Sequence, residues 1–153
     1  MTQEERQLLL KDLCVRLPYG VKAQVQGWDE AKEEEVNIPL KIYSINTDGY
    51  VYFESNDYDV TYCSIDACRL YLRPMSSMTE EEEKEYKLFF RIGEYTCGGS
   101  LYGEEYEYID ADSDDISQPT SLIDWLNAHH FDYRGLIKKG LALEAPNDMY
   151  KEK

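Results

Sequence analysis

Residues 38–53 read Ile-Pro-Leu-Lys-Ile-Tyr-Ser-Ile-Asn-Thr-Asp-Gly-Tyr-Val-Tyr-Phe and carry the clearest structural pattern in the chain. Apolar side chains alternate with others at Ile38, Leu40 and Ile42, which predicts a strand with one buried face. Asn46-Thr47-Asp48-Gly49 is a strong turn signal, because its glycine accommodates a positive φ. The aromatic and β-branched residues that follow predict the returning strand. The stretch therefore predicts an antiparallel β-hairpin.

Further elements are predicted on both sides of this hairpin. Residues 21–26 alternate apolar and polar side chains and predict an earlier strand, whereas residues 60–64 and 70–72 predict a fourth and a fifth. A capping box formed by Thr2 and Glu5 opens a helix ahead of the strands. Its leucines recur at spacings of three to four residues, as on one face of a helix.

A helix followed by five short strands suggests a small closed barrel, since closure would hide the strand edges. The order resembles an SH3-like or Sm-like barrel over positions 2–74, in pattern only and without a specific motif. Pro39 is expected at an edge position or a bulge of its strand, because proline has no N–H to donate.

The second half predicts helices. Thr79 and Glu82 form another capping box, and Pro119-Thr120-Ser121 opens a third helix. Residues 131–140 are expected to continue as an amphipathic helical tail. The predicted fold class is therefore α+β, with an N-terminal helix, a five-stranded antiparallel barrel and a helical C-terminal extension. Residues 1–74 would form the helix and barrel, and residues 75–153 an acidic extension packed on them as one compact unit.

The charge is strongly negative and uneven. The chain of 153 residues has 31 acids and 16 bases, a formal charge of −15, with net −5 over residues 1–74 and net −10 over residues 75–153. Such a charge repels phosphate backbones and anionic membranes, and it favours solubility, cation binding or a basic protein partner. The alternative is a solvated acidic surface without a partner.

Compartment and redox state follow from what the sequence does not contain. We see no export signal and no apolar run long enough to span a membrane. The four cysteines, Cys14, Cys63, Cys68 and Cys97, are therefore expected to be reduced thiols in a cytoplasm. Cys63 and Cys68 are too widely spaced for a typical zinc pair, and the other two do not supply a second pair.

The only histidine cluster supplies weak catalytic candidates, His129, His130 and Asp132. Adjacent histidines on a helix point about 100° apart, so they rarely bind one metal. Acid–base catalysis would need a nearby nucleophile, and no motif such as Gly-x-Ser-x-Gly supplies one. The alternative is that these histidines lie at a helix C-terminus, where the helix dipole favours them.

An acidic stretch supplies weak metal candidates, Asp110, Asp112 and Asp114. It begins like a calcium loop, but its sixth position is Asp115 instead of glycine and its twelfth is Ser121 instead of glutamate. An acidic loop is the simpler interpretation. We predict no cofactor.

Fourteen tyrosines, many beside an acidic residue, are unusual for this length. Tyrosine supplies rigid, amphipathic contact area and is enriched at protein interfaces. On strands, however, tyrosines can equally cover a core. Weak partner-binding candidates come from the acidic second half: Tyr102, Glu104, Glu105, Tyr106, Glu107 and Tyr108.

Two segments near the C-terminus, residues 124–137 (DWLNAHHFDYRGLI) and residues 140–146 (GLALEAP), resemble a signature of small uncharacterised proteins from gut anaerobic bacteria and their phages. Residues 71–80 are similar to the same group. The group has no known activity, so the resemblance assigns no functional residue. It implies a bacterial cytoplasmic setting, on a mobile element.

Three functions remain open. The first is a non-enzymatic adaptor or modulator that binds another protein, including an acidic mimic of nucleic acid that would occupy a basic site. The second is a small metal-dependent or His/Asp hydrolase. The third is an Sm-like RNA binder, which the charge disfavours and which would need a basic patch from Lys22, Lys41, Arg69 and Arg73.

Overall fold

The structure is a computed structural model that describes residues 1–97 and 118–151. The chain divides into two compact units, one formed by residues 1–74 together with 127–153 and the other by residues 75–126. The C-terminal extension predicted for residues 75–153 is thus shared between the units. Its last part, from Asn127 onward, belongs with the N-terminal residues.

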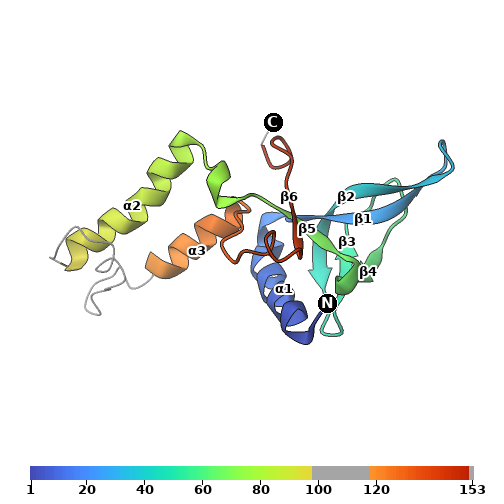
Figure 1. The fold of residues 1–153 in the computed structure, drawn as a ribbon, viewed down its shortest axis with the longest axis horizontal. Coiled ribbons are helices and arrows are strands. Elements are labelled where there is room, and N and C mark those ends of the chain that lie inside the picture. Colours follow the sequence, from blue (N-terminus) through green and yellow to red (C-terminus); the bar gives the residue numbers. More distant parts are fainter. Residues whose placement is uncertain (98–117, 152–153) are drawn as a thin grey trace. The chain divides into compact units, whose positions relative to one another are not determined.

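The larger unit combines one long helix with a sheet (Figure 1). Its elements in chain order are α1 (Gln3–Arg16), a 3-10 turn (Leu17–Tyr19), β1 (Lys22–Asp29), β2 (Glu34–Ile45), β3 (Tyr50–Phe53), β4 (Tyr62–Ser64), a second 3-10 turn (Ile65–Ala67), β5 (Arg69–Leu72) and β6 (Ala142–Glu144). The smaller unit contains a 3-10 turn (Met75–Ser77), α2 (Glu80–Cys97) and most of α3 (Gln118–Ala128).

The six strands form one curled, mixed sheet with the order β4-β3-β2-β1-β5-β6. All neighbours are antiparallel except β5 and β6, which run parallel. The α+β class, the N-terminal helix and the first five strands are confirmed. A five-stranded antiparallel SH3-like barrel is not confirmed, because β6 adds a sixth, parallel strand beside β5.

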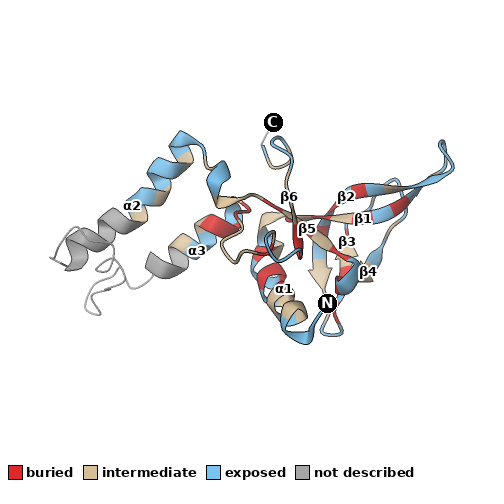
Figure 2. Ribbon diagram, viewed as in Figure 1, coloured by how far each residue is buried: buried red, intermediate tan, exposed pale blue. Residues whose placement is uncertain are grey.

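The core of the larger unit lies on one face of this sheet, against α1 (Figure 2). Val21, just before β1, is buried there. Alternate strand residues are buried with it, as the sequence pattern predicts: Ala23, Val25, Ile38, Leu40, Ile42, Val51, Phe53, Leu70 and Leu72. From α1, Leu9 and Leu13 join them. Each such side chain stabilises the fold by roughly 1.5–3 kcal/mol relative to exposure to water.

Both predicted capping boxes are present. In α1, the Thr2 N–H donates to Glu5 Oε2 at 2.8 Å, and the Glu5 N–H donates to Thr2 Oγ1 at 3.1 Å. The same pair of bonds joins Thr79 and Glu82 at the start of α2, at 3.0 and 3.2 Å. Each box satisfies two backbone donors that the first turn of a helix leaves without partners.

The predicted hairpin turn between β2 and β3 is also confirmed. Asn46 Oδ1 accepts from the N–H groups of Asp48 and Tyr50 at 3.1 and 2.9 Å. Gly49 has a φ of 85°, and a Cβ at this position would lie 2.5 Å from Arg6 Nη2. The backbone conformation therefore favours glycine, and a Cβ would in addition have to displace the flexible end of the Arg6 side chain.

Pro39 lies in a part of β2 that pairs with β1 only. It is opposite Gln24 of β1, whereas β3 pairs with β2 between Ile42 and Ile45. The register shifts between Ile42 and Ser44, which leaves Tyr43 at a bulge. Proline is tolerated because this stretch of β2 has an unpaired side within the described sheet.

The predicted helical tail over residues 131–140 is wrong. Residues 129–140 form turns and an isolated bridge between Arg73 and Phe131, and the next segment is strand β6. His130, Gly135 and Gly140 have φ values of 61°, 72° and 74°. These left-handed conformations interrupt any continuous helix.

The smaller unit is held together by aromatic contacts between its two helices. Trp125 Nε1 donates to Glu85 Oε2 at 2.9 Å, and the Trp125 ring centroid lies 6.1 Å from those of Tyr86 and Phe89. Across the described ranges of both units, no helix is both long enough and apolar enough to cross a membrane.

Candidate functional site

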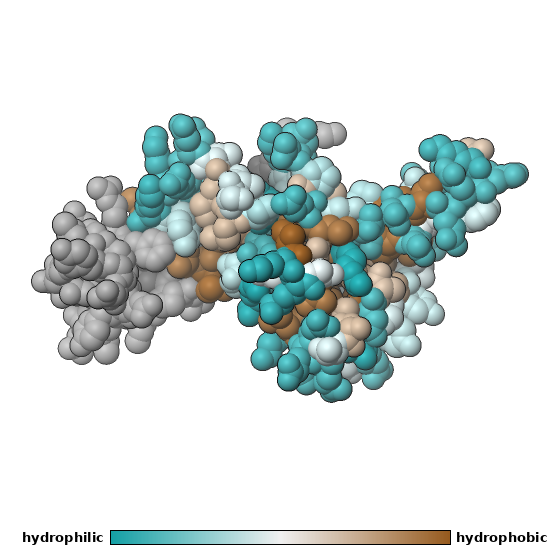
Figure 3. Space-filling view, in the orientation of Figure 1, coloured by the Kyte–Doolittle hydropathy of each residue, from teal (hydrophilic) through white to brown (hydrophobic). Residues whose placement is uncertain are grey.

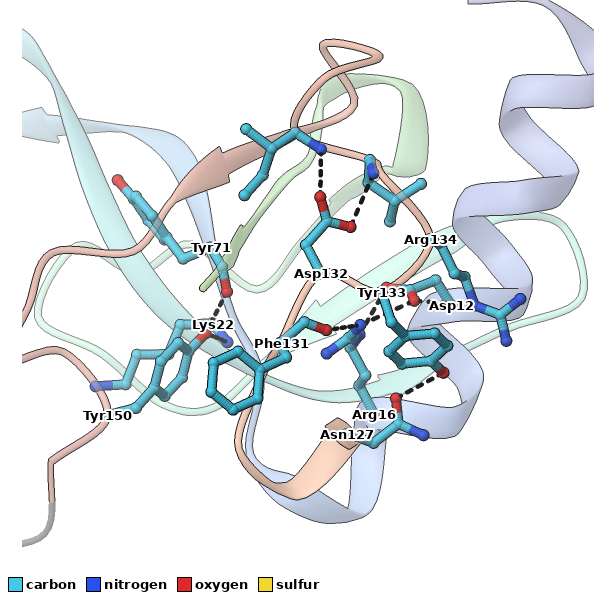
Figure 4. A network of polar contacts seen from close by, with 12 residues as sticks. Asp12, Arg16, Lys22, Tyr71, Asn127, Phe131, Asp132, Tyr133, Arg134 and Tyr150 are labelled. Atoms are coloured by element: carbon cyan, nitrogen blue, oxygen red, sulfur yellow. Dashed lines mark hydrogen bonds and ion pairs between the residues drawn. The ribbon is translucent and has the colours of Figure 1, made fainter. Parts of the chain in front are cut away.

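A buried ion pair joins α1 to the C-terminal segment (residues 127–151). Asp12 and Arg16 are one helical turn apart and both are 0% exposed. Arg16 Nε donates to Asp12 Oδ2 at 2.7 Å, and Arg16 Nη2 donates both to Asp12 Oδ1 and to the carbonyl oxygen of Phe131, at 3.1 and 2.6 Å (Figure 4). A buried guanidinium needs such partners, because burial of an unpaired charge is very costly.

A second arginine shares the same carboxylate. Arg134 Nε forms an ion pair with Asp12 Oδ1 at 3.2 Å. The guanidinium groups of Arg16 and Arg134 lie 5.3 and 5.1 Å from the ring centroid of Tyr133, whose hydroxyl donates to Asn127 Oδ1 at 2.9 Å. Two cations therefore surround one acid, and the Tyr133 ring compensates part of the excess positive charge.

Tyr150 holds the end of the C-terminal segment against the sheet. Its hydroxyl accepts from the Lys22 N–H at 2.9 Å and donates to the carbonyl oxygen of Tyr71 at 2.7 Å. Its ring is stacked on His130 at a centroid distance of 3.6 Å. Burial raises the pKa of Tyr150, so the hydroxyl stays protonated as these bonds require.

His130 is buried and uncharged at neutral pH. Burial, followed by the positive charges of Arg16 and Arg73, lowers its pKa from 6.5 to about 3. A histidine with this pKa is a poor proton donor near pH 7, although its neutral ring packs well against Tyr150.

The other two predicted catalytic residues also have structural contacts. Asp132 accepts from the backbone N–H groups of Leu136 and Ile137 at 2.8 and 2.9 Å, so its carboxylate caps a turn. The His129 ring is stacked on Phe131 at 6.2 Å. These contacts give His129, His130 and Asp132 roles in packing and capping.

The remaining predicted site residues lie outside the described residues. These are the metal candidates Asp110, Asp112 and Asp114 and the partner-binding candidates Tyr102, Glu104, Glu105, Tyr106, Glu107 and Tyr108. Within the ranges that the structure describes, no group of three or more His, Cys, Asp and Glu side chains is arranged to hold a metal ion.

Two cysteines lie close to the core: Cys68 is buried within it, and the half-buried Cys63 packs against it. Hydrogen bonding from the Cys68 thiol stabilises a thiolate at Cys63 and lowers the Cys63 pKa. It also raises the pKa of Cys68, because ionised Cys68 could no longer donate and would be desolvated.

One tyrosine in each of the strands β2, β3 and β4 is exposed to solvent and does not cover the core. Tyr43, Tyr50 and Tyr62 are 58%, 42% and 56% exposed. Their neighbours Val51 and Phe53 fill the inner face of β3 instead. Because side chains alternate along a strand, burial of Val51 and Phe53 places Tyr50 and Tyr52 on the outer face.

Four of these residues, Tyr43, Tyr50, Tyr52 and Tyr62, touch one another and are called the tyrosine cluster below. Tyr52 and Tyr62 are directly opposite across β3 and β4, with ring centroids 5.8 Å apart. Tyr62 is also 5.8 Å from Tyr50, in an edge-to-face arrangement, and Tyr52 is 6.4 Å from Tyr43. The cluster thus forms a continuous aromatic surface across β2, β3 and β4.

The chain around the tyrosine cluster is acidic. Residues 42–68 contain no lysine or arginine and five acids: Asp48, Glu54, Asp57, Asp59 and Asp66. Two cations come from neighbouring elements: Lys41 pairs with Glu54 at 3.0 Å, and Arg6 lies 3.9 Å from Asp66. A net negative charge remains, and it favours positively charged groups near the cluster.

The four basic residues that an Sm-like RNA surface would need are engaged by the protein itself. Lys22 Nζ and Arg73 Nη1 donate to the carbonyl oxygens of Met149 and His129, at 3.3 and 3.4 Å. Arg69 Nη1 donates to two backbone carbonyl oxygens of its own segment, and Lys41 pairs with Glu54. These contacts leave the RNA-binding interpretation without support from a basic patch.

Comparison with known proteins yields no match: no family model, no curated protein and no solved structure matches this chain. The candidate site is therefore defined by geometry alone. Sequence reasoning did not select the tyrosine cluster, although a signal was available. Tyrosines at positions 50 and 52 alternate with Val51 and Phe53, and such alternation indicates a tyrosine face opposite a buried face.

Proposed function

We propose that this protein is a non-enzymatic adaptor or modulator that binds another protein, and that the tyrosine cluster is its binding surface. One observation carries the proposal: four tyrosines, joined in a row by three ring contacts, lie on the outer face of the sheet instead of covering the core, and three of them are exposed. Contiguous exposed aromatic surface marks interaction sites, and tyrosine is among the residues that dominate binding energy at interfaces.

The acidic nucleic-acid mimic is another form of protein binding, and it would use a second surface. Residues 29–35, at the tip of the β1–β2 hairpin, contain five acids and one lysine, and Trp28 beside them is 54% exposed. The projecting end of this hairpin is teal, and therefore hydrophilic, in Figure 3. Carboxylates on a projecting arm suit a basic groove that normally holds phosphates. A cytoplasmic, mobile-element origin in bacteria belongs to the same proposal.

The test is affinity capture from a bacterial lysate with four forms of the full chain. Wild type is compared with Tyr52→Ser/Tyr62→Ser, with the hairpin variant Glu33→Gln/Glu34→Gln/Glu35→Gln, and with Val15→Ala, an exposed site on α1. A protein lost only with the tyrosine variant supports the cluster as the surface. Loss only with the hairpin variant supports the mimic. Equal capture by all four forms contradicts both.

The hydrolase and the Sm-like RNA binder stay as alternatives with less support. The contacts of His130 and Asp132 are those of packing and capping, and the barrel that an Sm-like function implies remains a prediction. Hydrolysis of generic ester or phosphoester substrates that is abolished by His129→Ala would favour the first. Salt-sensitive binding of single-stranded RNA would favour the second.

A further inference from the structure

The open edge of the sheet lies directly beside the tyrosine cluster. β4 is the terminal strand of the described sheet and pairs only with β3. The Phe53 N–H donates to the carbonyl oxygen of Thr61, and the Ile65 N–H donates to the carbonyl oxygen of Gly49. Cys63 of β4, midway between Thr61 and Ile65, is paired with Val51 of β3. Because bonding direction alternates along an antiparallel strand, the backbone groups of Tyr62 and Ser64 face the open edge.

Such an edge can bind an extended chain. A strand that pairs with β4 would place every second side chain on the same face as Tyr62, whose ring in turn contacts Tyr50 and Tyr52. Backbone hydrogen bonds would give the affinity, and the tyrosine rings would select the side chains. The edge and the cluster therefore form one composite surface.

The charges indicate which side chains suit this surface. Residues 42–68 supply five acids and no base, and aromatic faces attract cations. Arginine fits best, because its planar guanidinium can stack on a tyrosine ring and form a bidentate pair with a carboxylate. A second copy of this chain would bring a further formal charge of −15, and a nucleic acid would bring its phosphates.

We propose that β4 and the tyrosine cluster bind an extended, arginine-rich segment of a partner protein by strand addition, with alternate arginines over the tyrosine rings. This inference rests on the proposed function, because it names the partner chemistry of the same surface. Asp57 and Asp59, both exposed in the loop before β4, add negative charge to the segment that leads into this strand.

The experiment uses a fluorescent ten-residue peptide in which arginine alternates with threonine, titrated against the full-length protein by fluorescence anisotropy. Three comparison probes are a lysine analogue, an arginine peptide with alternate backbone amides N-methylated, and a uridine-rich RNA of ten nucleotides. We expect the arginine peptide to bind at least fivefold more tightly than the lysine analogue. Methylation on the bonding edge is expected to weaken binding at least tenfold.

Protein variants locate the site. Tyr52→Ser/Tyr62→Ser should weaken binding of the arginine peptide at least tenfold, whereas Tyr62→Phe, which keeps the ring, should stay within threefold of wild type. Val15→Ala, an exposed apolar site on α1 outside the cluster, should leave binding unchanged. Retention of the folded circular-dichroism spectrum shows that a loss of binding is not a loss of folding.

Opposite results overturn the inference. The inference fails if the arginine peptide does not bind, or if it binds Tyr52→Ser/Tyr62→Ser as tightly as wild type. It also fails if the methylated peptide binds as tightly as the unmethylated one, or if the RNA binds more tightly than the arginine peptide. The proposed function fails separately, when a partner captured from lysate binds the tyrosine variant as well as wild type. A partner that needs the cluster but is not displaced by the peptide would keep the function and reject the arginine-rich chemistry.

Discussion

Arg16 Nη2 donates to the carbonyl oxygen of Phe131 at 2.6 Å and thereby joins α1 to a residue 115 positions later in the chain. Arg16 and Phe131 are both 0% exposed. The bond is charge-assisted and buried, so it is among the stronger kinds of hydrogen bond in proteins. It is one of several contacts that join the two ends of the sequence into the larger unit.

Removal of the acid in this network should be strongly destabilising. Asp12→Ala would leave Arg16 buried without its carboxylate, which typically costs about 3–5 kcal/mol of unfolding free energy. Urea denaturation of the full chain, followed by circular dichroism, measures the effect.

A paired replacement supplies the control for that prediction. Asp12→Leu/Arg16→Met removes both charges, so it should cost less than Asp12→Ala alone. If the single variant is as stable as wild type, or if the double variant is the less stable of the two, the pair does not have the role described here.

The Tyr150 hydroxyl should contribute measurably to docking of the C-terminal segment. Tyr150→Phe keeps the stacked ring on His130 but removes the bonds to Lys22 and Tyr71. We expect a loss of about 1–3 kcal/mol, since a buried donor and a buried acceptor lose their partner. Faster proteolysis near residue 149 would report local release of the segment. An unchanged cleavage rate and unchanged stability would contradict this role.

His130 should make stability depend on pH between its unfolded and folded pKa values. The folded pKa of about 3 lies below the reference value of 6.5, so the unfolded state binds more protons in this window. The stability that comes from keeping His130 neutral is fully present above pH 6.5 and is lost as the pH falls toward 3. For wild type, the urea concentration at the unfolding midpoint should decrease from pH 7.5 to pH 6.5 and again to pH 5.5. His130→Phe should flatten the dependence; parallel curves for both proteins would refute the prediction.

The Cys63 thiol should react faster than an ordinary thiol of equal exposure. Its pKa is lowered by the hydrogen bond with Cys68, so more thiolate is present at pH 7.5. In a Cys14→Ser/Cys97→Ser background, Cys68→Ala should slow alkylation of Cys63 by iodoacetamide at this pH. An equal or higher rate in Cys68→Ala would show that the bond does not activate Cys63.

The sequence predicts the helix and the first five strands because their signals are local. Alternation of apolar residues, capping boxes and the turn at Asn46 each depend on neighbours within a few positions. β6 is different, because it is three residues long and is defined by its parallel pairing with β5, about 70 positions earlier in the chain. Nothing local to Ala142–Glu144 shows that partner, and a short apolar run is compatible with either helix or strand.

The sequence indicated the chemical character of the candidate site but not its position. Abundant tyrosine and excess acid indicate a protein-binding surface, but the residues selected from the sequence lie in the acidic second half and not on β2, β3 and β4. The contacts among Tyr43, Tyr52 and Tyr62 depend on the bulge in β2 and on the register of β3 with β4. Both are tertiary features, and a shift of one residue in register would turn the tyrosines toward the core.

Substitutions in the tyrosine cluster should affect binding far more than folding. Tyr52→Ser/Tyr62→Ser removes an exposed cross-strand aromatic pair, which should cost about 1 kcal/mol of unfolding free energy. The core side chains beneath it are unchanged. Urea denaturation measures this cost, and a loss of several kcal/mol would show that the cluster has a structural role instead.

The most direct test of the account is the dissociation constant of a captured and purified partner, measured by isothermal titration calorimetry. Wild type, Tyr52→Ser/Tyr62→Ser and Val15→Ala would be titrated in the same buffer. We expect the dissociation constant to be at least tenfold larger for the tyrosine variant and unchanged for Val15→Ala. Equal dissociation constants for wild type and the tyrosine variant would contradict the claim that the tyrosine cluster is the binding surface.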